Sequence, residues 1–191
     1  MKAAFPLAAL ALALGAVTGA LVLPAAFRSD NSHTLAGSTP SGWTEVAWPF
    51  PADQFGRGKA FQCSAADCGT AVTLYVRAKI GFCNCTTGVA DDAELERISD
   101  LDLLGVKAAA QGDGRPIAVA WMKGRSRAYA LAAADNRPGK SALSIGYNER
   151  CDAIVATAVV PHERPGDVES GVIELLSGPT VMRWIEVTIG L

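Results

Sequence analysis

Residues 71–80 read AVTLYVRAKI, and this segment has the clearest strand pattern in the chain. Apolar side chains recur at every second position and β-branched residues are frequent, which is typical of a strand in a sheet. One face would carry Val72, Leu74, Val76, Ala78 and Ile80, and the opposite face Thr73, Tyr75, Arg77 and Lys79. The segment therefore predicts a strand whose two faces differ in polarity.

The flanking sequence predicts further strands. Residues 43–51 (WTEVAWPFP) are aromatic and bounded by proline, which is tolerated at a sheet edge, so we expect an edge strand or a docked arm. The other predicted strands are 60–63, a hairpin of 116–122 with 127–133, a hairpin of 141–147 with 151–160, and a final strand at 180–189. Residues 123–126 and 148–150 would form the turns of the two hairpins.

Two segments predict helices. The first begins at Asp91, because Asp91-x-x-Glu94 has the form of a capping box, and it ends at Gly105. The second begins at Pro165, a good first-turn residue, and ends at 178–179. The buried stripes would be Leu95, Ile98, Leu101 or Asp102, and Leu104 in the first helix, and Val168, Val172, Leu175 and Leu176 in the second. This order of elements predicts an α+β domain with a mainly antiparallel sheet and two helices.

The N-terminal segment predicts export. Lys2 precedes an uncharged apolar run over residues 3–27, the pattern of a signal peptide or of a transmembrane anchor. Residues 28–42, rich in Ser, Thr, Gly and Pro, predict a flexible linker. We therefore expect residues 43–191 to form an extracytoplasmic domain. It would be held at the inner membrane by a single N-terminal helix, with the membrane as its partner there, or released into the periplasm if the signal is cleaved.

The net charge and the absence of known motifs restrict the class of function that we expect. The 17 Lys and Arg residues against 19 Asp and Glu give a formal net charge of -2, so nucleic acid is not an expected partner. The chain has no phosphate-binding glycine loop, no nucleophile elbow and no His-Glu-x-x-His motif. We therefore expect a non-catalytic binding or scaffold module that has an unknown protein partner and no cofactor.

Five cysteines lie in the exported part: Cys63, Cys68, Cys83, Cys85 and Cys151. In an oxidising compartment they are interpreted first as disulfide candidates. Cys63 and Cys68 flank a short polar turn and could close a small loop. Cys83 and Cys85 are separated by one residue, so a bond between them would be strained. We expect one of these two to pair with Cys151 and the other to stay free.

The Cys83-x-Cys85 loop also supports an alternative function. Two thiolates on one side of a loop favour soft ions, so Cys83 and Cys85 are candidate ligands for Cu or Zn. A strained, easily reduced pair would instead suit thiol-redox chemistry. A nucleophilic cysteine would need contact with His162, which lies in a Pro-flanked polar loop and is expected to be only solvated.

Two charged segments have simpler interpretations. The acidic residues between 91 and 102 are expected on the solvated face of the first helix. Lys123, Arg125 and Arg127 are expected at a basic hairpin tip that provides solubility.

Three stretches resemble uncharacterised exported or membrane-anchored proteins of proteobacteria. They are WPFPADQFGRGKAFQC (48–63), YVRAKIGFCNC (75–85) and TGVADDAELERISDLDLL (87–104), and the tail CDAIVATAVV with VIELLSGPTVMRW is also similar. The resemblance covers most of 43–191 and implies an exported domain without implying an activity. The order of elements is also faintly similar to the Mog1/PsbP-like α/β/α sandwich.

Overall fold

A computed structural model describes residues 40–133, 139–161 and 164–191. The predicted signal peptide or anchor at 1–27 and residues 28–39 of the predicted linker lie outside the described residues. Those that are described belong to one compact unit, Leu35–Leu191. Within this part of the chain, no helix has both the length and the apolar composition needed to cross a membrane.

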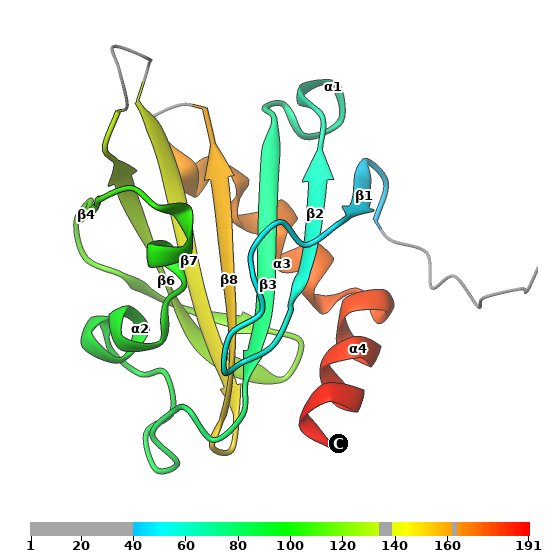
Figure 1. The fold of residues 1–191 in the computed structure, drawn as a ribbon, viewed down its shortest axis with the longest axis vertical. Coiled ribbons are helices and arrows are strands. Elements are labelled where there is room, and N and C mark those ends of the chain that lie inside the picture. The colour runs from blue at the N-terminus through cyan, green and yellow to red at the C-terminus, as the bar shows by residue number, and fades with distance from the viewer. Residues whose placement is uncertain (1–39, 134–138, 162–163) are drawn as a thin grey trace, which may run out of the picture. The chain divides into compact units, whose positions relative to one another are not determined.

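Eight antiparallel strands form one sheet (Figure 1). They pair in the order β1-β2-β3-β8-β7-β6-β4, and β5 also pairs with β6. Their bounds are β1 Trp43–Val46, β2 Lys59–Cys63, β3 Val72–Lys79, β4 Ala108–Ala110, β5 Arg115–Val119, β6 Met122–Leu131, β7 Lys140–Glu149 and β8 Asp152–Val160. The mainly antiparallel sheet of the predicted α+β class is therefore confirmed.

Several strand predictions agree with this sheet. The segment 71–80 contains β3, which lies between β2 and β8 near the centre of the sheet. The segment 43–51 contains β1, which lies at an edge. Both predicted hairpins form, as β5 with β6 and β7 with β8.

The predicted turn of the first hairpin is wrong. Val119 pairs with Met122, so the turn consists of Ala120 and Trp121, and residues 123–126 lie inside β6. Ala120 has a left-handed φ of 50°, which such a tight turn requires. The basic residues of 123–127 therefore do not form a hairpin tip. They alternate along a strand, and two of them bind acidic residues of the preceding helix at Asp92–Ile98.

The described residues contain four α-helices and two 3-10 helices. They are α1 Ala65–Cys68, α2 Asp92–Ile98, η1 Leu101–Leu104, η2 Pro165–Val168, α3 Glu169–Ser177 and α4 Pro179–Ile189. The first predicted helix corresponds to α2 and η1, and Asp91 caps α2 by accepting a hydrogen bond from the Glu94 amide. The second corresponds to η2 and α3.

The final strand predicted at 180–189 is wrong, because this segment is α4. Its β-branched residues favour a strand locally, but Pro179 starts a helix well, and Val181, Met182 and Ile185 form a buried stripe at helical spacing. Packing of this stripe on the sheet outweighs the weak local preference.

Helices cover both faces of the sheet to unequal extents (Figure 1). Helices α3 and α4 pack on one face over the largest core cluster, which includes Leu74 and Ile145. On the opposite face α2 covers a smaller cluster that includes Cys83 and Val155. At Gly146, where α2 crosses the sheet, an added Cβ would lie only 2.9 Å from the Cδ1 atoms of two α2 side chains. The glycine therefore sets how closely α2 approaches.

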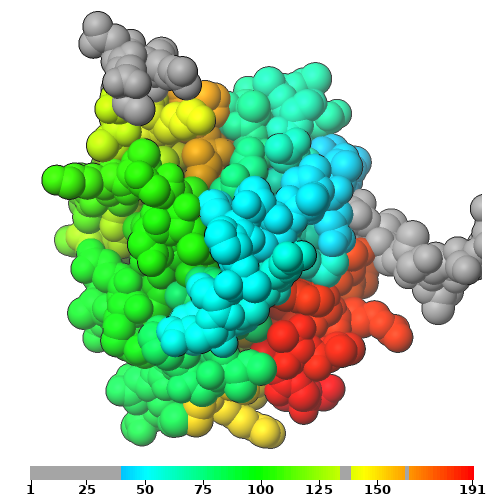
Figure 2. All heavy atoms as spheres, in the orientation of Figure 1, coloured from blue at the N-terminus to red at the C-terminus, as the bar shows by residue number. Residues whose placement is uncertain are grey.

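The segment between β1 and β2 also lies on the α2 side. Figure 2 shows it as a diagonal cyan band between the green region that contains α2 and the red α4. Gly58 near its end has no room for a side chain, because a Cβ would lie 2.1 Å from the Val76 carbonyl oxygen. This close approach brings Asp53 and Phe55 over the end of β3.

Candidate functional site

The disulfide bonds of the structure confirm the predicted pairing of the cysteines. Cys63 is bonded to Cys68, and Cys85 is bonded to Cys151. Cys83 is the free cysteine and is buried. The first bond closes the loop around α1, and the second joins the β3–α2 loop to the β7–β8 turn across 66 positions of sequence. Two distant loops are therefore held at one end of the sheet.

Cys83 is free because it fits an apolar site. Its side chain is only 7% exposed and packs with Val89 and Leu95 beneath α2, whereas Cys85 is exposed. Its Sγ donates to the Arg150 carbonyl oxygen at 3.3 Å. Burial raises the pKa of the Cys83 thiol, and nearby carboxylates add to the effect. The thiol is therefore protonated at neutral pH and is a weak nucleophile there.

A metal at Cys83 and Cys85 would need a different state of the loop. Cys85 is held in a disulfide, so it offers no thiolate until that bond is reduced. Within 40–133, 139–161 and 164–191, no group of three or more His, Cys, Asp or Glu side chains is placed to hold a metal ion. Cu or Zn binding stays a prediction for the reduced chain. His162, the predicted partner of a nucleophilic cysteine, lies outside the described residues.

A buried ion cluster lies on the α2 side of β3, and the sequence did not predict it. Arg77 is 3% exposed and Asp100, just before η1, is 5% exposed. The guanidinium binds both carboxylate oxygens of Asp100, and its third nitrogen donates to Asp53 at 2.6 Å. The hydrogen bond from Arg77 holds the pKa of Asp53 below its ordinary value of 3.8. Both carboxylates thus bind one buried guanidinium.

Lys79 completes the cluster. Its Nζ lies 2.8 Å from Asp100 and donates to the Ile98 carbonyl oxygen at 2.7 Å and to the Ser99 carbonyl oxygen at 3.3 Å. These carbonyls belong to the C-terminal end of α2, where the helix dipole favours a cation. The ammonium is also 5.0 Å from the ring centroid of Phe55. Lys79 therefore supplies hydrogen bonds to carbonyl groups at the end of α2 from inside the domain.

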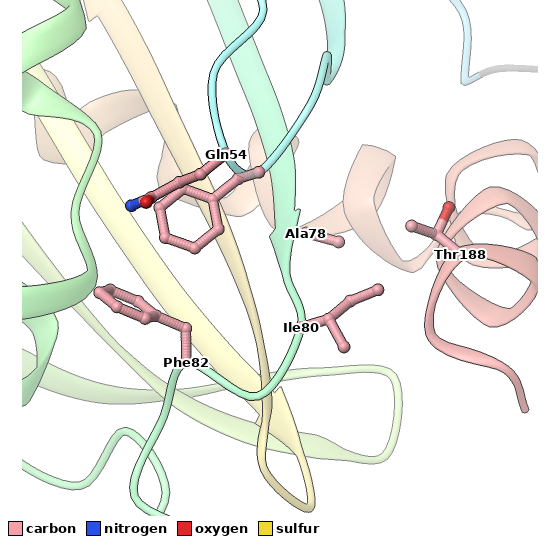
Figure 3. A pocket seen from close by; sticks show the side chains of 6 residues that line it. Gln54, Ala78, Ile80, Phe82 and Thr188 are labelled. Atoms are coloured by element: carbon pink, nitrogen blue, oxygen red, sulfur yellow. The ribbon is translucent and has the colours of Figure 1, made fainter.

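A groove of about 330 Å³ opens beside this cluster (Figure 3). Its lining comes from three parts of the chain: Gln54 and Phe55 before β2, Ala78, Ile80 and Phe82 at and after the end of β3, and Thr188 of α4. The rings of Phe55 and Phe82 meet edge to face with centroids 4.8 Å apart. Ile80, predicted on the apolar face of the strand, lies just past the end of β3 and is 63% exposed.

The groove follows an open edge of the sheet. β2 pairs with β3 only as far as Val76, whereas β3 continues to Lys79 and pairs over this stretch with β8. In the described chain, no strand pairs with Arg77–Lys79 on the β2 side. On this side the last residues of β3 therefore have no strand partner, and they lie next to apolar side chains.

Further charged residues of α2 and β6 are paired with each other within the domain. Asp92 of α2 accepts from Arg125 and from the Gly114 amide, and Arg127 donates to Glu96 at 2.6 Å. The prediction that the acidic residues of 91–102 form a solvated helix face is therefore wrong for the buried Asp100, whereas the half-buried Asp92 and the exposed Glu96 also bind arginines of β6. Their partners come from strands far away in sequence, which the acidic spacing alone does not reveal.

A buried serine lies on the opposite face, and it too has an internal partner. Ser126 Oγ donates to Glu169 Oε2 at 2.6 Å, and the same carboxylate accepts from Arg115 at 2.9 Å. A small pocket of about 190 Å³ lies beside them. The serine, the carboxylate and the arginine satisfy one another, so this trio is a structural network at the start of α3.

Comparison with family models and with curated proteins finds no match to this chain. The resemblance to exported proteobacterial proteins therefore stays a prediction.

Proposed function

We propose that this chain is an extracytoplasmic binding module, held at the inner membrane by its N-terminal segment or released into the periplasm if that segment is cleaved, and that it binds a protein partner without catalysing a reaction. Two features support export. The apolar run at 3–27 has the composition of a signal or anchor, and disulfides such as Cys63–Cys68 and Cys85–Cys151 persist in oxidising compartments.

The open edge of β3 inside the groove is the observation that carries the binding role. An extended segment of a partner could add to a sheet edge through main-chain hydrogen bonds while its side chains enter adjacent pockets. Here the edge at Arg77–Lys79 is flanked by the exposed Ile80 and by two phenylalanine rings. We therefore propose an apolar, extended segment of another protein as the occupant.

The polar groups of the domain support binding over catalysis. The buried cations Arg77 and Lys79 are neutralised by carboxylates, and the Cys83 thiol is protonated beneath α2. A catalytic group must be poised to exchange a proton or attack a substrate. Groups that satisfy one another inside the domain instead keep the groove in one shape.

Site-specific photocrosslinking in intact cells tests this function. A photoreactive residue at Ile80 of the full-length chain should yield a discrete adduct with one partner, and the same residue at Ala109 on the opposite sheet edge should not. In a chain that carries the crosslinker at Phe82, Ile80→Asp should remove the adduct and Ala109→Asp should retain it. Because both side chains are exposed, neither aspartate should change the thermal midpoint. Adducts that form equally from both edges, or that survive Ile80→Asp, would contradict the proposal.

Protease protection in spheroplasts tests the location separately. The domain should be cleaved by added protease only when the outer membrane is removed, and the inner membrane should stay intact during the assay. Resistance until the inner membrane is also lysed would place the domain in the cytoplasm and contradict the proposed location.

A further inference from the structure

The free cysteine Cys83 contacts the backbone of Cys151, the residue whose disulfide partner is Cys85. The Cys83 amide donates to the Cys151 carbonyl oxygen at 3.1 Å, so the β3–α2 loop and the β7–β8 turn are hydrogen-bonded at these two residues. The Cys83 Sγ is 3.3 Å from the carbonyl oxygen of Arg150, which is one peptide bond before Cys151. These two contacts hold Cys83 against the turn that contains Cys151.

We propose that Cys83, Cys85 and Cys151 form an internal thiol switch with two disulfide isomers. In the exchange, the Cys83 thiol loses its proton to solvent and its thiolate attacks the Cys151 Sγ. The Cys83–Cys151 bond forms as the Cys85–Cys151 bond breaks, and Cys85 leaves as a thiolate that takes up a proton. One disulfide and one thiol are present before and after, so the step consumes no oxidant or reductant.

Backbone geometry selects Cys151 over Cys85 as the sulfur attacked. The hydrogen bond of 3.1 Å from the Cys83 amide to the Cys151 carbonyl oxygen keeps the two Cα atoms within about 7 Å of each other, close to the range that disulfides span. Cys83 and Cys85 are separated by a single residue, and a bond between them would strain the loop. Attack on Cys151 therefore gives the less strained product.

The two isomers differ in the exposure of the free thiol. With Cys85 bonded, the free thiol is Cys83, which is packed beneath α2 with Val89 and Leu95. With Cys83 bonded instead, the free thiol is Cys85, whose position in the loop is exposed. Apolar burial of Cys83 favours the first isomer. The exchange thus converts a sheltered thiol into one that an external reagent can reach.

Alkylation and disulfide mapping test the switch in the full-length chain purified without reductant. The folded protein is incubated with N-ethylmaleimide at pH 7 and at pH 9.5, quenched in acid, digested and mapped by mass spectrometry. Because burial raises the pKa of Cys83 above its ordinary value of 9.0, exchange should be slow at pH 7 and at least tenfold faster at pH 9.5. The expected product carries the label on Cys85 and a bond between Cys83 and Cys151.

Two variants distinguish exchange from simple loop opening. Cys83→Ser should leave Cys85 unlabelled at both pH values, because the attacking thiol is absent. Cys85→Ser should still fold, as checked by tryptophan fluorescence, and should contain the Cys83–Cys151 bond. The proposal is overturned if labelled Cys85 appears equally in Cys83→Ser, if the native chain is labelled on Cys83 alone, or if folded Cys85→Ser keeps Cys83 and Cys151 as free thiols or bonds them between molecules.

Discussion

The buried cluster around Asp100 makes the sharpest prediction about stability. Asp100→Asn replaces the carboxylate by an amide of nearly the same shape, so the substitution removes the charge without leaving a cavity. The amide cannot neutralise Arg77 and Lys79, which are 3% and 4% exposed and both contact this carboxylate. In either orientation its NH₂ group would also face a donor of Arg77. The variant therefore tests whether two buried positive charges need this single anion.

The magnitude follows from what remains in the variant. Breaking a buried ion pair by removing one partner costs about 3–5 kcal/mol, because an uncompensated charge stays behind. Arg77 keeps Asp53, and Lys79 keeps the carbonyls of Ile98 and Ser99, so we expect the lower end, about 3 kcal/mol. Domains are stable by about 5–15 kcal/mol in total, so the loss is large but need not prevent folding.

Urea unfolding monitored by tryptophan fluorescence, without reductant, measures this loss. The matched control is Asp102→Asn, two residues further along in η1, where the side chain is exposed; its unfolding midpoint should stay at the wild-type value. A loss below about 1 kcal/mol for Asp100→Asn would refute the reasoning, since this is the size of one ordinary hydrogen bond. The cluster would then contribute no more than an exposed ion pair does.

Three further predictions concern the disulfides, α2 and acid. Cys151→Ser should lower the free energy of unfolding by roughly 4 kcal/mol, because the lost bond spans 66 positions, and Cys63→Ser by roughly 2 kcal/mol, because its bond spans 5. Equal losses in urea titrations would argue against an origin in loop entropy. Gly146→Ala should lower the free energy of unfolding by about 1–3 kcal/mol, because the new methyl group pushes α2 off the sheet. The control Gly171→Ala lies in a helix with open space beside it and should raise that free energy by about 0.5–1 kcal/mol. Thermal melts measure both, and an unchanged midpoint for Gly146→Ala would show that α2 can shift without cost. The pKa of Asp53 is lowered in the fold, so its contribution is complete above the unfolded value of 3.8 and is lost as pH falls through the folded value; Asp53→Asn should flatten the stability profile below pH 4, and an unchanged acid slope would contradict this.

Most of the sheet was predictable because its strands have a local signature. Alternation in 71–80 marks β3, and proline bounds the edge segment that contains β1. The segment that forms α4 was misassigned for the converse reason. Its β-branched residues suit a strand, and the helix becomes favourable only when the stripe at 181, 182 and 185 packs on a sheet formed by distant residues.

The cysteine pairing was predictable in outline, because the strain of a bond between Cys83 and Cys85 leaves Cys151 as the better partner for one of them. Which of the two stays free depends on the apolar site beneath α2, and that site exists only after folding. The buried ion cluster left a weak signal, two cations at alternate positions of a strand. Its anions come from segments 23 and 24 positions away, so only the fold brings them together.

Because helices cover the two faces of the sheet unequally, we expect the free energy of local opening to differ between the two faces. The α3–α4 face is sealed by a broad apolar cluster, whereas α2 is held by a few apolar side chains and by ion pairs. Amide hydrogens of α2 should therefore exchange with solvent deuterium at a lower free energy than those of β7 and β8. The bond from Cys85 to Cys151 keeps the loop before α2 fastened to the sheet throughout such an opening. We therefore expect α2 to open locally while it stays tethered, and to pack again on the same site.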